Sequence, residues 1–589
     1  MISHLSMARM IAARSSAWTR LRRLAAPRMP APAERPPAAP RRPQETHAAA
    51  SGAPHSRADR CRTGAVMSTA AVASPAGGDD AARAKARRNW FGFFAMTFGV
   101  FMAFLDIQIV ASSLNEIRAG LSASVQEISW VQSAYLIAEV IAIPLSGYLS
   151  RILSTRVYFT LSVLGFTAAS AACAMAWNIE SMMLFRALQG FLGGGMIPSA
   201  FAALYMMFPP DKRVVPQVLA GLVATSAPTL GPVIGGYITD LSSWHWLFLV
   251  NLLPGLLVAA AVWALVDIDR PQPALWKGID LPGVATMALF LGATEWVLEE
   301  GPSHNWLDDG AIVSWAAVAV VAGTLFFWRV LTHHNPIVDL RPFRNPHFAC
   351  ANAAAALLSI SLFAGNYVVP LFLGQVRGFN SRQIGDTLMM SGVAMFLAAP
   401  FAARLARRYD LRYLFVFGSV LVVIGSVLMA NLTADSGFAE LALPQLLRGG
   451  GFMLALVCCS TLSLSTLPPQ ALKNASGLYS LMRNLGGALG LAAINTILYA
   501  REALHERQLL EAITPTRAPV RALLETMPGG LADRANLPAV ARLLQLVQQQ
   551  SAVLSYNDTL IAMCWIGVVA APLFLLVKRP NLNGPAPQH

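Results

Sequence analysis

The chain has 589 residues, of which 55% are hydrophobic and only 13% are charged, and its mean hydropathy is +0.51. Soluble domains carry roughly a quarter of charged residues, so most of this chain cannot face water. The apolar stretches are long enough for membrane-spanning helices and too continuous for the alternating strands of a barrel. Composition therefore predicts an all-α polytopic membrane protein.

The formal net charge of +13 does not indicate a nucleic-acid partner. Residues 1–66 hold twelve arginines against three acidic residues and so supply +9 of that charge. The other basic residues lie mostly in short loops between apolar stretches, where basic residues set the orientation of a membrane protein.

Residues 1–89 differ in character from the rest of the chain. They are rich in alanine, proline and arginine and lack apolar periodicity, so we expect a disordered basic tail. An arginine-rich, acid-poor segment also resembles a transit peptide. Met67, however, opens a polar leader of the kind that precedes a first span. We therefore expect the true start at Met67.

From residue 90 onward, apolar length and flanking charge predict about fourteen spans. Their expected limits are 90–112, 129–150, 157–177, 181–205, 216–239, 246–266, 281–299, 311–331, 348–373, 384–404, 412–431, 441–466, 473–499 and 556–577. The expected domains are the tail 1–89, a six-span bundle 90–266, two inserted spans with a linker 267–347, a second six-span bundle 348–579 with an external loop 500–555, and a tail 580–589.

Basic residues gather in alternate loops. With the amino end inside, the cytoplasmic loops carry Lys212, Arg270 and Arg329, whereas the opposite loops carry acids such as Glu180 and Asp240. Because an excess of lysine and arginine marks the cytoplasmic side, we expect both termini in the cytoplasm.

A short internal repeat supports a duplicated architecture. The repeated residues are Pro144, Leu149, Arg151 and Arg156, and then, with identical spacing, Pro400, Leu405, Arg407 and Arg412. Both sets straddle the end of an expected span, and two extra spans lie between the duplicated halves. Parallel halves of this kind build transporters whose substrate site lies between them near the bilayer midplane.

Three ionisable residues lie inside expected spans, namely Asp106, Glu139 and Arg186. A charge at the bilayer centre costs about 2.5–3.5 kcal/mol on insertion scales, so each needs water, a partner or neutralisation. Burial disfavours a charged carboxylate, which suits a proton carrier, and a nearby arginine restores the charge. We expect Asp106 to carry a proton, tuned by Arg186 and Glu139. The alternatives are acids that only steady helix contacts and an arginine that reaches the interface.

Glycines and a proline mark the fifth expected span at Gly231, Pro232, Gly235 and Gly236. Glycines four residues apart let helices pack closely, and proline removes a backbone hydrogen bond and bends the helix. The pattern indicates a flexing or ion-tight contact, or ordinary tight packing.

The sequence lacks the signatures of the common enzymes and pumps. None of the five lysines lies in a Gly-Lys-Ser/Thr sequence, so no P-loop hydrolyses ATP here. No zinc-protease or Gly-x-Ser-x-Gly motif occurs, and the six cysteines form no C-x-x-C pair. We therefore expect no catalytic residues, no metal site and no cofactor, and an ion gradient as the energy source.

Several longer sequence motifs give a more specific indication of the protein family. They lie at 105–110, 130–135, 143–147, 186–190, 228–236, 244–248 with Asn251, 338–341, 483–487 and 556–558. In this collinear order the chain resembles, over about residues 90–580, the fourteen-span drug:proton antiporters of the major facilitator superfamily, the EmrB/QacA-like group. The resemblance implies two six-helix bundles plus two inserted helices.

The resemblance also suggests further site residues. Gln108, Arg483 and Asn484 become candidates for the substrate cavity. The loop after the second span becomes a gate motif made by Gly147, Arg151 and Arg156, repeated by Arg407 and Arg412. One departure stands out: Arg151 and Ser154 replace the acid and the second glycine of the superfamily pattern Gly-x-Leu-x-Asp-x-x-Gly. An aspartate-based gate contact is therefore not expected at this loop.

The implied function is proton-driven efflux of small amphipathic or toxic compounds across the bacterial cytoplasmic (inner) membrane. In a two-membrane bacterium, the resemblance implies a periplasmic adaptor and an outer-membrane channel as partners, with loop 500–555 as the docking surface. Two alternatives stay open: an importer or lipid flippase on the same fold, and a membrane sensor or scaffold that transports nothing.

Overall fold

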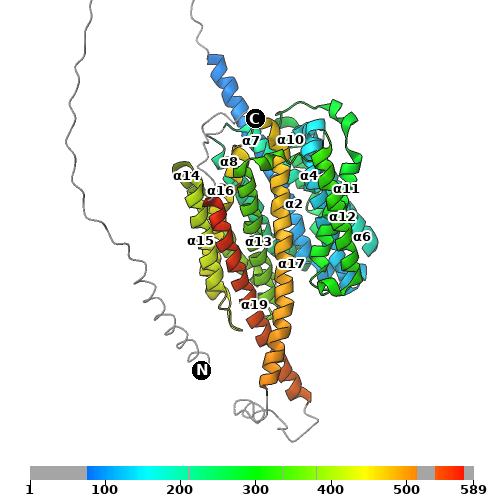
Figure 1. Cartoon of the computed structure of the whole chain (residues 1–589), viewed down its shortest axis with the longest axis vertical. Coiled ribbons are helices and arrows are strands. Elements are labelled where there is room, and N and C mark those ends of the chain that lie inside the picture. The colour runs from blue at the N-terminus through cyan, green and yellow to red at the C-terminus, as the bar shows by residue number, and fades with distance from the viewer. Residues whose placement is uncertain (1–75, 210–211, 335, 380, 514–536, 576–589) are drawn as a thin grey trace, which may run out of the picture. The chain divides into compact units, whose positions relative to one another are not determined.

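The computed structural model describes residues 76–209, 212–334, 336–379, 381–513 and 537–575. These residues form helices and connecting loops, and no strand occurs among them (Figure 1). The helices of the first half are α2 (Ala76–Ser112), α3 (Leu114–Leu121), α4 (Val125–Leu153), α5 (Thr155–Ala174), α6 (Ile179–Gly194), α7 (Met196–Met207), α8 (Val214–Leu241), α9 (His245–Leu249) and α10 (Leu252–Leu265). Those that follow are α11 (Leu281–Glu300), α12 (Gly310–Thr332), α13 (Pro346–Gln375), α14 (Ser381–Arg408), α15 (Leu411–Met429), α16 (Phe438–Ser465), α17 (Leu472–Ala512) and α19 (Leu537–Leu575).

The helices pack as two bundles with an added pair. In the first half, α4 packs on α6, α2 on α8, and α5 on α6 and α10; in the second, α16 packs on α14 and α15, and α13 on α17 and α19. Helices α11 and α12 pack on each other, and α11 also contacts α4 and α17, so the inserted pair covers one side of the seam between the halves (Figure 1). The predicted all-helical fold with two inserted helices is confirmed.

Thirteen segments of the described chain are long and apolar enough to cross a membrane. Helix α8, 28 residues long, occupies the expected span 216–239 as well. Two expected spans are each made of two helices, because α6 passes into α7 at Gly195 and α9 passes into α10 at Asn251. The second break bears directly on the site described below.

Two glycines of α6 set how closely that helix approaches α4. A Cβ atom added at Gly190 would overlap the backbone oxygen of Tyr135, and one added at Gly194 would overlap that of Glu139. Small residues allow this backbone-to-backbone packing in membranes. As a result, the polar side chains of α4 and α6 share one interior.

The ends of three helices differ from the prediction. Helix α2 begins at Ala76, so residues 76–89 are helical rather than part of a disordered tail. Helix α17 continues to Ala512 and α19 begins at Leu537, so most of the expected loop 500–555 is helix. Apart from one histidine, residues 501–512 are glutamate, arginine, glutamine, leucine and alanine, which are good helix formers, and no glycine or proline stops the helix. The tail 1–75, including Met67, and residues 580–589 lie outside the described chain.

The first turns of α2 and the last turns of α19 lie at the same end of the helix bundle (Figure 1). At the other end lie the last turns of α17, residues 500–512, and the first turns of α19, residues 537–555, which we call the α17–α19 extension. We call the first the basic end, because the arginine-containing loops α4–α5 and α14–α15 lie there, and the second the acidic end. Large apolar side chains such as Trp263, Trp328 and Phe396 are exposed on the bundle surface, as a lipid-facing wall requires.

Candidate functional site

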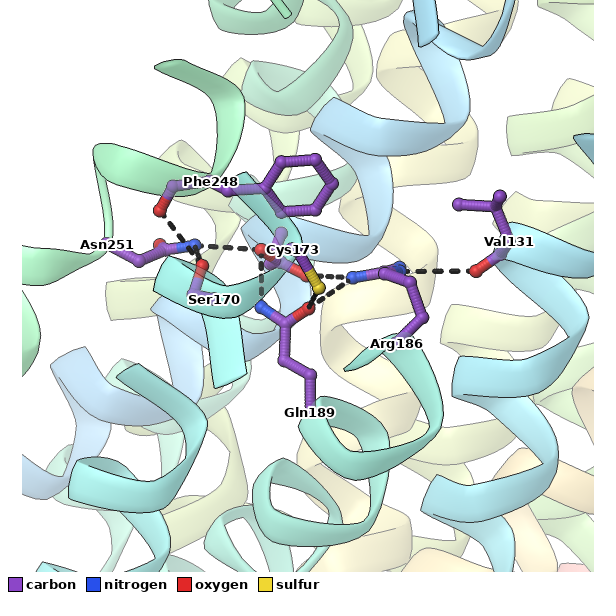
Figure 2. Close-up of polar contacts among 8 residues, drawn as sticks. Val131, Ser170, Cys173, Arg186, Gln189, Phe248 and Asn251 are labelled. Atoms are coloured by element: carbon purple, nitrogen blue, oxygen red, sulfur yellow. Dashed lines mark hydrogen bonds and ion pairs between the residues drawn. The ribbon is translucent and has the colours of Figure 1, made fainter. Parts of the chain in front are cut away.

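Asp106 of α2 lies in the interior of the first half, with its side chain fully buried. Arg186 Nη1 donates to its Oδ2 at 2.6 Å, Gln189 Nε2 donates to Oδ1 at 3.0 Å, and Asn251 Nδ2 donates to Oδ1 at 2.8 Å. Figure 2 shows the side chains of the three donors pointing toward one another, Arg186 and Gln189 from α6 and Asn251 from the α9–α10 break. Three donors, one of them a guanidinium, stabilise the charged form of this carboxylate.

Arg186 is itself fixed from several sides. Its Nε donates to the backbone oxygen of Val131 at 3.2 Å, and its Nη1 also contacts Gln189 Oε1 at 2.7 Å. Its guanidinium carbon lies 4.4 Å from the ring centroid of Tyr135. The side chain is 0% exposed, so the alternative of an arginine that reaches the interface is wrong. The Asp106–Arg186 pair therefore joins α2, α4 and α6.

Asn251 owes its position to the break between α9 and α10. The break places its amide beside α5, where Nδ2 also contacts Ser170 Oγ at 3.1 Å and Ser170 Oγ donates to the backbone oxygen of Phe248 at 2.9 Å (Figure 2). In the sequence, Asn251 belongs with the motif at 244–248, but the sequence alone assigns it no role in the site. Gln189 was also missed, although it lies three residues after Arg186 and so on the same helix face.

Glu139, the second expected acid, lies on α4 at the seam between the halves. It is buried, and Asn484 of α17 hydrogen-bonds to it while Arg483, also on α17, attracts its negative charge. The guanidinium of Arg483 is buried too and lies 5.4 Å from the ring centroid of Phe104 on α2. The predicted cavity residues Arg483 and Asn484 thus meet the predicted acid Glu139 in one place.

The glycine–proline motif of α8 packs against α2. A Cβ atom at Gly231 would overlap the side chain of Gln108, so the two helices touch there. Gln108 therefore lies at the α2–α8 contact. Thr239 Oγ1 donates to the backbone oxygens of Gly235 and Gly236 at 2.9 and 3.1 Å. Helix α8 runs unbroken through Pro232, whose side chain lies outside the described set.

At the basic end, Lys473 of α17 joins the two halves. Its Nζ donates to the backbone oxygen of Ser150 at 2.8 Å and forms an ion pair with Asp269. Asp269 also accepts from the backbone N–H of Thr155 at 3.1 Å through both oxygens, so it caps α5. Gly147 touches the Lys473 backbone, where a Cβ would overlap it. Asp269, from the loop after α10, therefore supplies a carboxylate beside the loop in which Arg151 replaces the acid of the superfamily pattern.

The arginines of the gate motif do not come together. Arg151 lies 5.3 Å from the ring centroid of Tyr148, and Arg156 lies 5.2 Å from that of Trp263. Arg412 forms an ion pair with Asp410 at 2.8 Å, at the start of α15. The side chain of Arg407 lies outside the described set. These residues shape two separate loops at the basic end.

Further hydrogen bonds seal the seam at the basic end. Tyr205 at the end of α7 donates to the backbone oxygen of Ser460 on α16 at 2.8 Å. Gln217 at the start of α8 donates to the backbone oxygen of Val457 at 3.1 Å and accepts from Thr461 at 3.0 Å. The structure is therefore closed at this end. Among the described residues, no group of three or more His, Cys, Asp or Glu is arranged to hold a metal ion.

Comparisons with known proteins agree with this architecture. A family model described as "Major Facilitator Superfamily" matches residues 96–491. The chain is 42% identical over 500 residues to the "Colistin resistance protein EmrB" of Acinetobacter baumannii, covering 84% of this chain and 98% of that protein. It is 28% identical over 490 residues to the "Multidrug export protein EmrB" of Escherichia coli K12, covering 82% and 94%.

Among solved structures, the fold resembles that of the human organic anion transporter MFSD10 (TETRAN). The TM-score is 0.52 at 13% sequence identity, and the match covers 81% of this chain and 99% of that one. At this identity the likeness concerns the fold.

Proposed function

Because the chain belongs to the Major Facilitator Superfamily, we propose that it exports small amphipathic compounds across a bacterial cytoplasmic membrane, driven by protons that move inward. Relatives that match over most of their length are named for multidrug export and for colistin resistance. The observation that carries the proton drive is the Asp106–Arg186 pair, a carboxylate and a guanidinium fully buried among three helices. Burial makes the protonation of such an acid dependent on its partners.

In this proposal, Asp106 exchanges protons as the halves move. A proton that enters from outside neutralises the carboxylate and weakens its bond to Arg186, which loosens the contact among α2, α4 and α6. When the basic end opens, Arg186 again favours the charged form and the proton leaves to the cytoplasm. Each elementary charge moved inward yields about 2.3 kcal/mol per 100 mV, which is enough for more than a tenfold concentration step.

Substrate would bind between the halves, beside Glu139, Arg483 and Asn484. These groups come from α4 and α17 and meet near the middle of the seam, where parallel-repeat transporters bind substrate. Entry of substrate from the cytoplasm would be blocked in this state by the contacts of Lys473 with Ser150 and Asp269. Inward opening must break that ion pair.

The basic end would face the cytoplasm, as the loop charges predict. The acidic end then carries the α17–α19 extension into the periplasm, where Asp558 holds the two helices together through His505 at 2.9 Å and Arg501 at 3.7 Å. We propose this extension as the docking surface for a periplasmic adaptor that leads to an outer-membrane channel. No cofactor is required, since the proton gradient supplies the energy.

The experiment is dye efflux from cells that make the protein, with a proton gradient imposed or collapsed. An exporter lowers cell-associated ethidium only while the gradient stands. An importer raises it, a lipid flippase moves labelled lipid instead, and a scaffold changes neither. A panel that includes ethidium and colistin then defines the cargo. If the gradient has no effect on export, the proton drive is wrong.

A further inference from the structure

Helix α11, one of the two inserted helices, carries a buried acid that the mechanism above does not use. Glu295 lies inside the apolar part of α11 and is only 6% exposed. Among the described residues, its Oε2 has no hydrogen-bond partner. A buried carboxylate without a partner must be neutralised, since its desolvation is too costly for a bare charge. A proton is the smallest ligand that does this.

Glu295 belongs to a row of carboxyl groups. Glu299 lies one helical turn further toward the acidic end, on the same face of α11, with its Oε2 also buried and unpartnered among the described residues. The face of α11 that carries both acids packs on α4, where the rings of Trp296 and Trp130 stack with their centroids 6.4 Å apart. The row therefore runs from the end of α11 inward along α4, the helix that carries Glu139.

The groups that face this row are few. On α4, Ser133 lies beside Glu299, and its hydroxyl donates to the backbone oxygen of Ser129. Arg483 of α17 and Arg186 of α6 both attract the charge of Glu139. The packed neighbour α12 carries one titratable side chain among its described residues, Arg329, which pairs with Asp280 at 2.5 Å at the far end of α11. Arg186 is already paired with Asp106, so among the described residues Arg483 is left to face three carboxyl groups, and protons must balance the others. The row holds no cluster suited to a metal ion among the described residues.

Tyr135 provides a second, independent sign of a proton path. Its hydroxyl is fully buried on α4, one turn from Glu139, and has no partner among the described residues. Its ring lies 4.4 Å from the guanidinium carbon of Arg186, which pairs with Asp106 at 2.6 Å. Tyr135 therefore has Glu139 on its own helix face and the Asp106–Arg186 pair beside its ring. A hydroxyl can accept a proton from one side and donate one to the other.

We propose that Glu299, Glu295 and Glu139 form a proton entry path between α11 and α4, and that Tyr135 links this path to Asp106. The proposal rests on the proton-driven export proposed above. Each step along the glutamates moves one proton from a carboxyl group to the next carboxylate, so the donor becomes charged as the acceptor becomes neutral. At Tyr135 the hydroxyl accepts a proton from Glu139 as it gives its own proton to Asp106, so the tyrosine ends neutral. The protons come from the aqueous phase at the acidic end, and no oxidant or reductant takes part. The inserted helix pair thereby acquires a role in ion coupling.

The test uses the purified full-length protein in liposomes, with ethidium as substrate and a trapped pH-sensitive dye. Glu295→Gln keeps the side-chain volume but cannot carry a proton. We expect it to slow proton-driven ethidium transport, and the coupled proton movement, by about tenfold or more. Ethidium exchange down its own gradient should stay close to the wild-type rate, because the substrate contacts at Arg483 and Asn484 are untouched. Glu295→Asp keeps the acid and should retain most of the coupling.

Glu300→Gln is the matched control, since Glu300 lies on the same turn of α11 but faces His304 at 3.8 Å. It should leave coupling unchanged. If Glu295→Gln does not accumulate in the membrane, Glu299→Gln carries the same test nearer the surface. Normal coupled transport by a folded Glu295→Gln or Glu299→Gln protein overturns the path alone. A wild-type protein that moves ethidium without protons overturns the proposed function instead.

Discussion

The fourth membrane-spanning segment of each half carries a buried arginine, and the two arginines lie in different surroundings. Arg186 in the first half meets Asp106 at 2.6 Å and is held by Gln189 and a backbone oxygen. Arg448 on α16 donates from Nη2 to the backbone oxygen of Ser361 at 3.0 Å, and its Nε has no partner among the described residues. No ion pair joins Arg448 to an acid in the described chain.

The surroundings of the two helices are otherwise alike. Gly190 packs α6 against the backbone of Tyr135 on α4, and Gly449 packs α16 against the backbone of Ser391 on α14, the second helix of its half. What differs is the acid: among the described residues of α13 to α19, no aspartate or glutamate is buried. An arginine stays protonated, so only the half with a carboxylate can exchange a proton. In the proposed mechanism, ion coupling therefore belongs to the first half.

The largest expected effect follows from removing that acid. Asp106→Asn keeps the shape and can still accept a hydrogen bond from Arg186, but it cannot bind a proton. We expect proton-driven uphill efflux of ethidium to fall by about a hundredfold or more, while downhill exchange is partly kept. Efflux from everted membrane vesicles measures both. The control is Asp386→Asn, an exposed acid of α14 that should behave as the wild type does.

If Asp106→Asn pumps normally against a gradient, Asp106 only steadies helix contacts. The comparison of the two halves would then lose its basis, and the carrier would have to be Glu139.

A smaller effect is expected on stability, and here the two arginines should differ in sign. Arg186→Met leaves Asp106 buried with an unbalanced charge, which costs about 3–5 kcal/mol in comparable buried pairs. Arg448→Met removes a buried charge that has no acid partner, so it should be neutral or stabilising. Thermal unfolding of the two purified variants in detergent measures which of them is the less stable. Equal losses would show that Arg448 has an anionic partner outside the described residues.

Much of this architecture was predictable from the sequence, because the cost of placing polar groups in lipid makes apolar length informative. The same argument found Asp106, Glu139 and Arg186. It was not applied to Glu295, although that residue lies inside the expected span 281–299, so the signal was present and unused. The helical ends at 76–89 and 501–512 were missed because polar residues can continue a helix once it leaves the membrane.

Other parts of the site could not be read from the sequence. Asp269 reaches the gate from the loop after α10, and nothing in that loop marks it as the partner of Lys473, 204 residues away. Asn251 serves Asp106 only because the backbone breaks between α9 and α10. The sequence did not single out Arg448, because whether an arginine has an acidic partner depends on which residues pack against it. Such contacts depend on tertiary packing that a single sequence does not display.

The smallest expected effect comes from giving the second half the acid it lacks. Asn366 of α13 lines the same small cavity as Arg448, together with Ser361 and Ser391. Asn366→Asp should change the unfolding free energy by less than about 1 kcal/mol, because the attraction to Arg448 offsets the cost of burying the carboxylate. Combined with Arg448→Met, the introduced carboxylate is left alone, and the double-mutant cycle should show a coupling of about 1–3 kcal/mol.

Transport then decides whether an ion pair alone suffices for coupling. Asn366→Asp should not restore uphill efflux to Asp106→Asn, because the introduced carboxylate would lack the neighbours that link Asp106 to the outside. Tyr135 packs on Arg186 beside Asp106 and lies one helical turn from Glu139, whereas no buried acid lies near Arg448 among the described residues. A paired carboxylate without a path for protons is only a structural element. If the protein that carries both Asp106→Asn and Asn366→Asp pumps ethidium against a gradient, any buried acid–arginine pair can couple, and the position of Asp106 carries no special meaning.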